Sequence, residues 1–326
     1  MDLFWAIALS FTLSAAFVRL LAGKHLAGAI LDVPNERSLH ARPVPRSGGI
    51  GLLAAAGLAW LAFAGYALAY AIALAGALAA ISLLDDVRPL PVAARLIVQA
   101  AAAALLLAGL DVKVMVALPV LLISIMWATN LYNFMDGADG LAAGMTVIGF
   151  AGYAVAGALA GEHDITVVSA IVAAAAAGFL VWNFHPARIF LGDCGSVPLG
   201  FLAAAVGLIG WTRDVWPWWF PAVLFAPFIV DATLTLLRRA WRGENIFAAH
   251  RGHYYQRLIR SGLGQRKTAI AAYGLMLGCA FAAVLARATG GFIAFAILMA
   301  LAAAFLIGIV LIERYLARTR VAACGE

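Results

Sequence analysis

Stretches of about 20 apolar residues recur from one end of this 326-residue chain to the other. Runs of that length can cross the hydrocarbon core of a bilayer as helices, which satisfy their own backbone hydrogen bonds inside lipid. The mean hydropathy is +0.99 and only 12% of the residues are charged, against about 25% in soluble domains. The sequence therefore predicts an all-α, polytopic integral membrane helix bundle, formed as one domain over residues 1–326.

The charge distribution orients this bundle. Eleven spans are expected, or ten if one short span is lost or merged, at about residues 3–21, 48–64, 67–84, 93–110, 114–129, 141–160, 165–183, 197–211, 218–237, 268–286 and 292–312. Of the 22 Lys and Arg residues, only Lys113, Arg213 and Arg287 fall in even-numbered loops. The positive-inside rule then places the odd loops and the C-terminus in the cytoplasm and the N-terminus outside. The basic charge needs no nucleic-acid partner, because membrane topology and anionic lipid account for it.

Five aspartates stand at the ends of apolar runs, all in loops that this topology places in the cytoplasm. They are Asp85 and Asp86 in LLDDVRP, Asp136 and Asp139 in NLYNFMDGADG, and Asp193 in FLGDCGS. Charge is costly at a bilayer, so carboxylates gathered on one face indicate a function. A divalent cation that holds phosphates is the leading candidate. For Asp85 and Asp86 alone, a helix end in water is a second explanation.

Two of these motifs, NLYNFMDGADG and FLGDCGS, also predict a local structure. Asn130, Asn133, Asp136 and Asp139 recur every three residues, which would align them on one helical face. A turn capped by Asx side chains is the simpler alternative. The Gly-rich FLGDCGS turn would present backbone N–H groups to an anion, with Ser196 as the N-cap of the next span.

Five segments together resemble the polyprenyl-phosphate N-acetylhexosamine-1-phosphate transferases, which include the bacterial phospho-MurNAc-pentapeptide and GlcNAc-1-phosphate transferases. In chain order they are DVPNERSLHARPVPRSGGIG (32–51), LLDD (83–86), NLYNFMDGADG (130–140), NFHPARIFLGDCGS (183–196) and HRGHYYQRL (250–258). The third is similar to the family's NxxNxxDGxDG segment. The matches follow the family order and cover nearly all the loop chemistry.

The resemblance implies a reaction. A sugar 1-phosphate of the N-acetylhexosamine class would pass from a UDP-N-acetylhexosamine to undecaprenyl phosphate, on the cytoplasmic side of the bacterial inner membrane, with release of UMP. It also implies Mg²⁺, with Mn²⁺ as the alternative, and suggests a homodimer. Such a step initiates O-antigen or other cell-envelope polysaccharide synthesis. HRGHYYQRL resembles members of O-antigen pathways that act on 6-deoxy-N-acetylhexosamines such as FucNAc or QuiNAc.

The resemblance also implies roles for individual residues. It assigns Asp193 and Asp85 to the metal, Asp85, Asp86, Asp136 and His253 to catalysis, and Asn133, Asp139, Arg188, Ser196 and Arg251 to substrate binding. Two segments depart from the family pattern. LLDD continues as DDVRP, without the third Asp or the Lys often found there, and the last motif, often HxHH, reads His253, Tyr254, Tyr255, Gln256. Only His253 is therefore carried over as a functional histidine.

The chemistry of such a reaction is dominated by charge. Donor and acceptor are both anionic phosphates, and a metal ion with Arg and His side chains would offset their repulsion. A phosphate monoester has a second pKa of about 6, so the lipid nucleophile is largely ionised at neutral pH. A dedicated base is then unnecessary. Asp86 could act as a base, but orientation or metal binding explains it equally well.

Several other residues have two explanations. Asp231 lies in the ninth expected span, and an ionisable residue inside a span indicates support of an active site. Arg37, His40 and Arg46 in the first loop could meet phosphate or uracil, while solvated positive charge explains them equally well.

Two other functional classes are considered. An ion-coupled transporter or lipid flippase would also combine many spans with acidic residues. Transport sites, however, lie near the bilayer midplane in broken helices, commonly with an inverted repeat. Here the acids stand at span ends on one side and no such repeat is visible, which favours the enzyme. A CDP-alcohol phosphotransferase is disfavoured because the chain has no DGxxAR motif.

Overall fold

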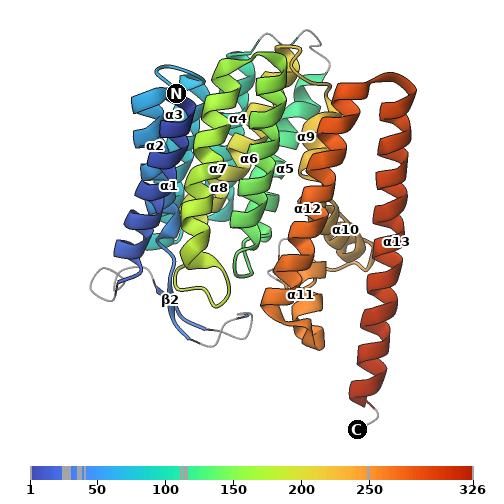
Figure 1. Cartoon of the computed structure of the whole chain (residues 1–326). Helices are drawn as coiled ribbons and strands as arrows, with labels where there is room; N and C mark the ends of the chain where they lie inside the picture. Colours follow the sequence, from blue (N-terminus) through green and yellow to red (C-terminus); the bar gives the residue numbers. More distant parts are fainter. Residues whose placement is uncertain are drawn as a thin grey trace.

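The fold is a bundle of helices that run side by side (Figure 1). The structure is a computed structural model and describes residues 2–23, 31–34, 39, 42–110, 112, 117–246, 248 and 250–324. Within this part of the chain the only sheet is a two-stranded antiparallel ribbon of β1 (Leu31–Asp32) and β2 (Val44–Pro45). The predicted all-α bundle is confirmed, and the small ribbon was not predicted. The single-domain assignment stays a prediction.

The helices follow the apolar runs. They are α1 (Asp2–Leu21), α2 (Gly48–Phe63), α3 (Ala69–Val87), α4 (Val92–Ala108), α5 (Leu118–Phe134), α6 (Leu141–Ala160), α7 (His163–Asn183), α8 (Asp193–Thr212), α9 (Trp219–Leu224), α10 (Ala226–Trp241), α11 (Tyr254–Leu258), α12 (Gly264–Thr289) and α13 (Gly291–Cys324). A π-helical turn, Ile259–Leu263, joins α11 to α12.

The helices differ in their capacity to cross a bilayer. Seven helical stretches of the described chain are long and apolar enough to do so, and α2, α4 and α5 are shorter apolar helices. Figure 1 shows α1 beginning at one end of the bundle and α13 finishing at the other, with β2 and α11 at that second end. The multi-helix membrane bundle matches the prediction. The count of eleven spans and the sidedness of the chain ends stay predictions.

The ninth expected span, at 218–237, is not one helix. α9 ends where Phe225 turns its N–H back to the carbonyls of Pro221 and Val223. Pro227, in the first turn of α10, has no N–H to donate to Val223, so the helical hydrogen-bond ladder cannot continue through this point. α10 consequently takes a new direction (Figure 1). Its residue Asp231 reaches the first residues of α11 and accepts hydrogen bonds from their N–H groups.

The helix α8 is the centre of the bundle. Nearly all its residues from Cys194 to Gly210 are buried, and it packs against α3 and α5. Its first turn touches the first turn of α2 at two glycines. A Cβ atom on Gly49 would lie 2.5 Å from the Cα of Gly195, and the N–H of Gly49 donates to the carbonyl of Leu191 at 2.8 Å. Small residues of this kind let membrane helices approach closely, and here they fix the start of α8.

The glycine contact predicts a difference between two substitutions in α2. Gly49→Ala should destabilise the protein by about 1–3 kcal/mol, because the new methyl group overlaps the backbone of α8. Gly57→Ala in the same helix meets no atom within 4 Å and should be neutral or stabilising by up to about 1 kcal/mol. Thermal unfolding of both purified variants in detergent tests this. Equal midpoints for the two would contradict the proposed close contact.

Candidate active site

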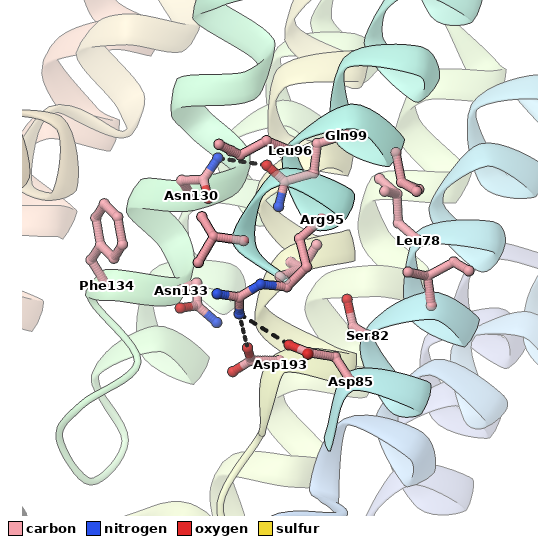
Figure 2. Close-up of a pocket in the computed structure, with 14 residues that line it drawn as sticks. Leu78, Ser82, Asp85, Arg95, Leu96, Gln99, Asn130, Asn133, Phe134 and Asp193 are labelled. Carbon is pink, nitrogen blue, oxygen red and sulfur yellow. Dashed lines mark hydrogen bonds and ion pairs between the residues drawn. The ribbon is translucent and has the colours of Figure 1, made fainter. Parts of the chain in front are cut away.

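Asp85 and Asp193 both face the guanidinium group of Arg95. Asp85 lies in the last turn of α3, Asp193 begins α8, and Arg95 extends from α4 between them (Figure 2). The Nη1 atom of Arg95 is 3.0 Å from Oδ2 of Asp85 and 3.7 Å from Oδ2 of Asp193. The other oxygen of Asp85 accepts the N–H of Leu90 at 2.6 Å. Two acids more than 100 positions apart are thus brought to a common point.

Asp86 faces a different set of partners from its neighbour in the chain. Its carboxylate accepts the N–H of Cys194 at 3.4 Å and lies 3.9 Å from Nη1 of Arg46. Only 4% of its side chain is exposed. A negative charge at the first turn of α8 is favourable, because that turn has N–H groups without helical partners. Arg37 and His40, proposed with Arg46 as phosphate or uracil contacts, lie outside the described residues.

The α5 end and the α8 start are joined by Asn133 and Ser196. The Nδ2 group of Asn133 donates to Oγ of Ser196 at 3.1 Å, and that hydroxyl is 3.2 Å from the carbonyl oxygen of Gly192, to which it donates. The prediction that Ser196 is the N-cap of this helix was wrong. The helix already begins at Asp193 with Gly192 as its N-cap, so Ser196 is inside the first turn.

The three-residue spacing of NLYNFMDGADG does not continue along one helix. α5 ends at Phe134, so Asn130 and Asn133 lie on it while Asp136 and Asp139 lie in the following loop. The helical-face prediction therefore holds for the two amides only. Asn130 turns toward α4, where its Nδ2 group donates to Oε1 of Gln99 at 2.6 Å (Figure 2).

Asp136 lies close to the acids of α3 and α8. Burial raises the pKa of Asp136 well above its usual range, and the negative charges of Asp193 and Asp86 raise it further, while the N–H of Gly192 offsets part of the effect by donating to the carboxylate. Carboxylates placed this close favour a bound cation, because a positive charge relieves their repulsion.

Asp139 is held by the neighbouring loop. Its Oδ2 atom is 2.7 Å from Nδ1 of His185 and accepts the N–H of Ala187 at 3.1 Å, and only 6% of the residue is exposed. The Asp139 N–H in turn donates to Oε1 of Gln265 at the start of α12. These contacts tie the loop after α5 to the loop after α7 and to α12. The substrate-binding role of Asp139 stays a prediction.

Two cavities meet at Asn133 and Asp193. The first lies among α3, α4, α5 and α8, and is lined by Leu78, Ile81, Ser82, Asp85, Val92, Arg95, Leu96, Val98, Gln99, Asn130, Asn133, Phe134, Asp193 and Val197. The second, of about 270 Å³, is lined by Asp32, Leu39, Arg46, Asn133, Asp136, Gly137, Ala138, Asp139, Asn183, Phe190, Gly192, Asp193, Gln256 and Gln265. Aliphatic side chains form much of the first wall, whereas polar groups dominate the second.

Three predicted residues are not brought to these cavities. Arg188 is exposed, and its guanidinium lies 5.4 Å from the Trp182 ring. Arg251 is half-buried and lines neither cavity. His253 is 3% exposed and reaches the cavity walls through two neighbours: its ring stacks on Phe134, at 6.2 Å between ring centroids, and its N–H donates to Oε1 of Gln256 at 3.4 Å. Their proposed catalytic and substrate-binding roles stay predictions.

The structure adds residues that the motif analysis missed. Arg95 and Gln99 both line the first cavity from α4. Their spacing of four residues inside an otherwise apolar run is a signal that could have identified them, because it puts both on one helical face. Gln256 and Gln265 also line the second cavity. Gln256 lies in the HRGHYYQRL segment but was given no role, and nothing in the local sequence pattern marked Gln265.

The oxygen ligands suit a hard cation. Among the described residues, no three His, Cys, Asp or Glu side chains form a ready-made metal cluster. Mg²⁺ characteristically uses only one or two carboxylates and completes its coordination with water and substrate phosphates. Asp193 and Asp85 supply carboxylate oxygens on either side of Arg95, so the ligand chemistry at this point is compatible with Mg²⁺.

The fold and the site define a multi-pass membrane protein with an acidic centre at one end of its helices. The sequence pattern of glycosyl transferase family 4 matches residues 68–211. A Bacillus subtilis (strain 168) protein, named probable undecaprenyl-phosphate N-acetylglucosaminyl 1-phosphate transferase, is 31% identical over 265 residues, 76% of this chain and 74% of the relative. The decaprenyl-phosphate N-acetylglucosaminephosphotransferase of Mycobacterium tuberculosis (strain ATCC 25618 / H37Rv) is 30% identical, covering 78% and 74% of the two chains.

A phospho-N-acetylmuramoyl-pentapeptide-transferase of Geobacillus thermodenitrificans (strain NG80-2) is 43% identical over a shorter stretch, 43% of this chain and 42% of that protein. The chain belongs to glycosyl transferase family 4. The family resemblance inferred from the five segments is thereby confirmed, and the narrower O-antigen subgroup stays a prediction.

The Asp139 contacts predict a coupled loss of stability. Asp139→Ala should cost about 1–3 kcal/mol, because it leaves the Ala187 N–H without an acceptor. The double variant with His185→Ala should lose less than the sum of the single losses, by about 0.5 kcal/mol or more. Unfolding titrations in mixed micelles measure both.

Glu162→Ala is the control. Glu162 forms a half-exposed ion pair with Arg213 at the other end of α7, and its loss should change the free energy of unfolding by less than about 1 kcal/mol. Strict additivity would contradict the Asp139–His185 coupling.

Proposed function

We propose that the protein transfers an N-acetylhexosamine 1-phosphate from a UDP-sugar to undecaprenyl phosphate and releases UMP. The observation that carries the proposal is the meeting of two unlike cavities at Asn133 and Asp193. A reaction between a water-soluble nucleotide sugar and a lipid phosphate needs one polar and one apolar approach to a common point. The names of the relatives state the same kind of acceptor and transferred group.

Each cavity is assigned to one substrate by its lining. The second cavity, with Arg46, Gln256 and Gln265, offers the charged and amide donors that a diphosphate and a sugar require. The first cavity has aliphatic walls, including Leu78 and Leu96, that fit the first isoprene units of the acceptor. The lipid phosphate would then reach Arg95 and the shared wall.

The chain's own groups manage the charge of the reaction. Arg95 neutralises Asp85 and Asp193, and it lines the first cavity, where it can donate to the acceptor phosphate. Asp86 accepts the Cys194 N–H and lies beside Arg46. These fixed partners favour an orienting role for Asp86 over that of a mobile base, in keeping with an acceptor phosphate that is already ionised.

We propose Mg²⁺ as the cofactor, with Mn²⁺ as the alternative. Asp193 and Asp85 would hold it, since their oxygens flank the point where both cavities meet. When bound, such an ion supplies positive charge that stabilises the phosphate oxygens during transfer.

The proposal includes a location and a pathway class. The acidic site would face the cytoplasm of a bacterium at its inner membrane, where the predicted positive-inside topology puts these loops. The product would begin an O-antigen or another cell-envelope polysaccharide. The sugar is an N-acetylhexosamine, with 6-deoxy forms included because of the HRGHYYQRL segment. A homodimer stays a prediction.

UMP release tests the reaction directly. Purified protein with undecaprenyl phosphate, Mg²⁺ and a panel of UDP-N-acetylhexosamines should release UMP with at least one donor, and EDTA should stop it until Mg²⁺ is restored. Asp193→Asn should lower kcat by about 100-fold or more, because charge stabilisation is lost. Asp164→Asn, at the start of α7, is the matched control and should stay near the wild-type rate. No UMP with any donor would contradict the enzyme, and ion-coupled uptake by proteoliposomes would then favour a transporter.

A second measurement tests the cavity assignment. Arg95→Ala should raise the apparent KM for undecaprenyl phosphate by roughly tenfold, equivalent to about 1.4 kcal/mol, and should change the KM for the UDP-sugar much less. Arg88→Ala removes an exposed charge just before α4 that lines neither cavity, and it should leave both constants near their wild-type values. A rise in the donor KM alone would reverse the assignment of the two cavities.

A further inference from the structure

Asp231 binds the backbone of the segment that follows the last large loop. It lies in α10 and is 8% exposed. Its Oδ1 atom accepts the N–H of Tyr254 at 2.8 Å, and its Oδ2 atom accepts the N–H of Tyr255 at 3.0 Å. The Nδ1 atom of His253 lies 3.3 Å from Oδ1. One side chain thus contacts three consecutive residues of another segment.

A carboxylate is the group that satisfies this geometry. Two N–H donors approach two different oxygens, and the Thr235 hydroxyl, one turn along α10, also donates to Oδ1 at 3.3 Å. A carboxylate can accept all of these hydrogen bonds, whereas an amide offers one acceptor oxygen and turns an NH₂ donor toward the second N–H. The negative charge also faces the first N–H groups of α11, where it is favourable.

The opposite side of the same segment touches the acidic loop. The Tyr255 hydroxyl donates to the carbonyl of Phe134 at 3.0 Å, at the end of α5. It also fills the space above Gly137, because a Cβ atom there would lie 2.2 Å from the Tyr255 oxygen. Gln256, the next residue, lines the second cavity together with Asn133 and Asp193. The segment is therefore enclosed between Asp231 and the loop that carries Asp136.

We propose that Asp231 is a positioning residue of the transferase: by holding the backbone of residues 253–256, it keeps Tyr255 against Phe134 and Gly137 and so fixes Asn133 and Asp136 relative to Asp193. This inference rests on the proposed function. Asp231 itself lines neither of the two cavities that meet at Asp193. It acts through Tyr255 on residues that do, and not by contact with a substrate.

Glu313 provides a matched comparison. It is a second acid that holds the same segment, from α13, by accepting hydrogen bonds from Arg257 at 2.8 Å and from Arg238. Within the described part of the chain, the hydrogen bonds of Glu313 go to side chains, while Asp231 accepts hydrogen bonds from the backbone that places Tyr255. A general loss of anchoring would therefore affect both acid variants alike, whereas positioning through Tyr255 would distinguish them.

The decisive test is a double-mutant cycle in UMP release, with kcat expressed per folded protein. Asp231→Asn should lower kcat by about tenfold to 100-fold, the loss expected for a small misplacement of reacting groups, with little change in either KM. Tyr255→Phe should lower kcat in the same direction. The double variant should be no worse than Asp231→Asn by more than about threefold, because both changes break the same connection. Glu313→Gln should stay within about threefold of the wild type.

Two outcomes with an active wild type would overturn the inference and leave the proposed function intact. One is a fully active Asp231→Asn variant, and the other is a double variant in which the two single losses of kcat multiply. If Asp231→Asn does not fold, Tyr255→Phe alone decides: an unchanged kcat overturns the inference and a lowered kcat supports it. Hydrogen exchange gives a readout independent of activity. Asp231→Asn, or Tyr255→Phe in its place, should raise exchange in residues 133–140, and unchanged exchange there would overturn the inference even if the wild type released no UMP with any donor.

Discussion

Negative charge concentrated at the first turn of α8 is the constraint around which this end of the bundle is arranged. Asp193 opens that turn, and its charge and that of Asp86 add to burial in raising the pKa of Asp136. Three sources of positive charge or dipole oppose the repulsion: the N–H groups at the helix start, one of which donates to Asp86, and the side chains of Arg46 and Arg95. Each comes from a different segment, so charge balance itself brings distant parts of the chain together.

Packing supplies the precision that charge alone lacks. Coulomb attraction falls off slowly with distance and would tolerate many arrangements of the loops. The contact between Gly49 and Gly195, in contrast, allows no side-chain atom between the starts of α2 and α8. Backbone hydrogen bonds from Gly48 and Gly49 to the carbonyls of Phe190 and Leu191 extend the same contact. The turn that presents Asp193 is consequently held by backbone atoms, whose positions do not depend on rotamers.

The sequence predicted the helices better than the site. Apolar runs identify the helices because bilayer length and hydropathy act locally, and even the break at Phe225 had a local cause in Pro227. The site depends on contacts between segments, which periodicity does not record. Arg95 looked like one more cytoplasmic charge until α4 placed it between two acids. Ser196 resembled a cap because the start of α8 was expected several residues later.

The aspartates near the start of α8 and in α10 differ in what their carboxylate oxygens contact. This difference decides which of them can bind a metal ion. The side chains of Asp86, Asp139 and Asp231 are 4%, 7% and 10% exposed. All three accept backbone N–H groups, so their charge is committed to holding loops. Asp85 is intermediate: one oxygen accepts the N–H of Leu90, and the other faces Arg95 at the first cavity.

Asp193 is 32% exposed, and its ion-pair partner Arg95 lies 3.7 Å away, beyond hydrogen-bond distance. It also borders both cavities. A carboxylate that keeps its oxygens accessible can bind a cation without first giving up a structural hydrogen bond. That free-energy difference supports the proposal that Asp193 is an acid that binds the cation, while the buried acids around it hold the loops.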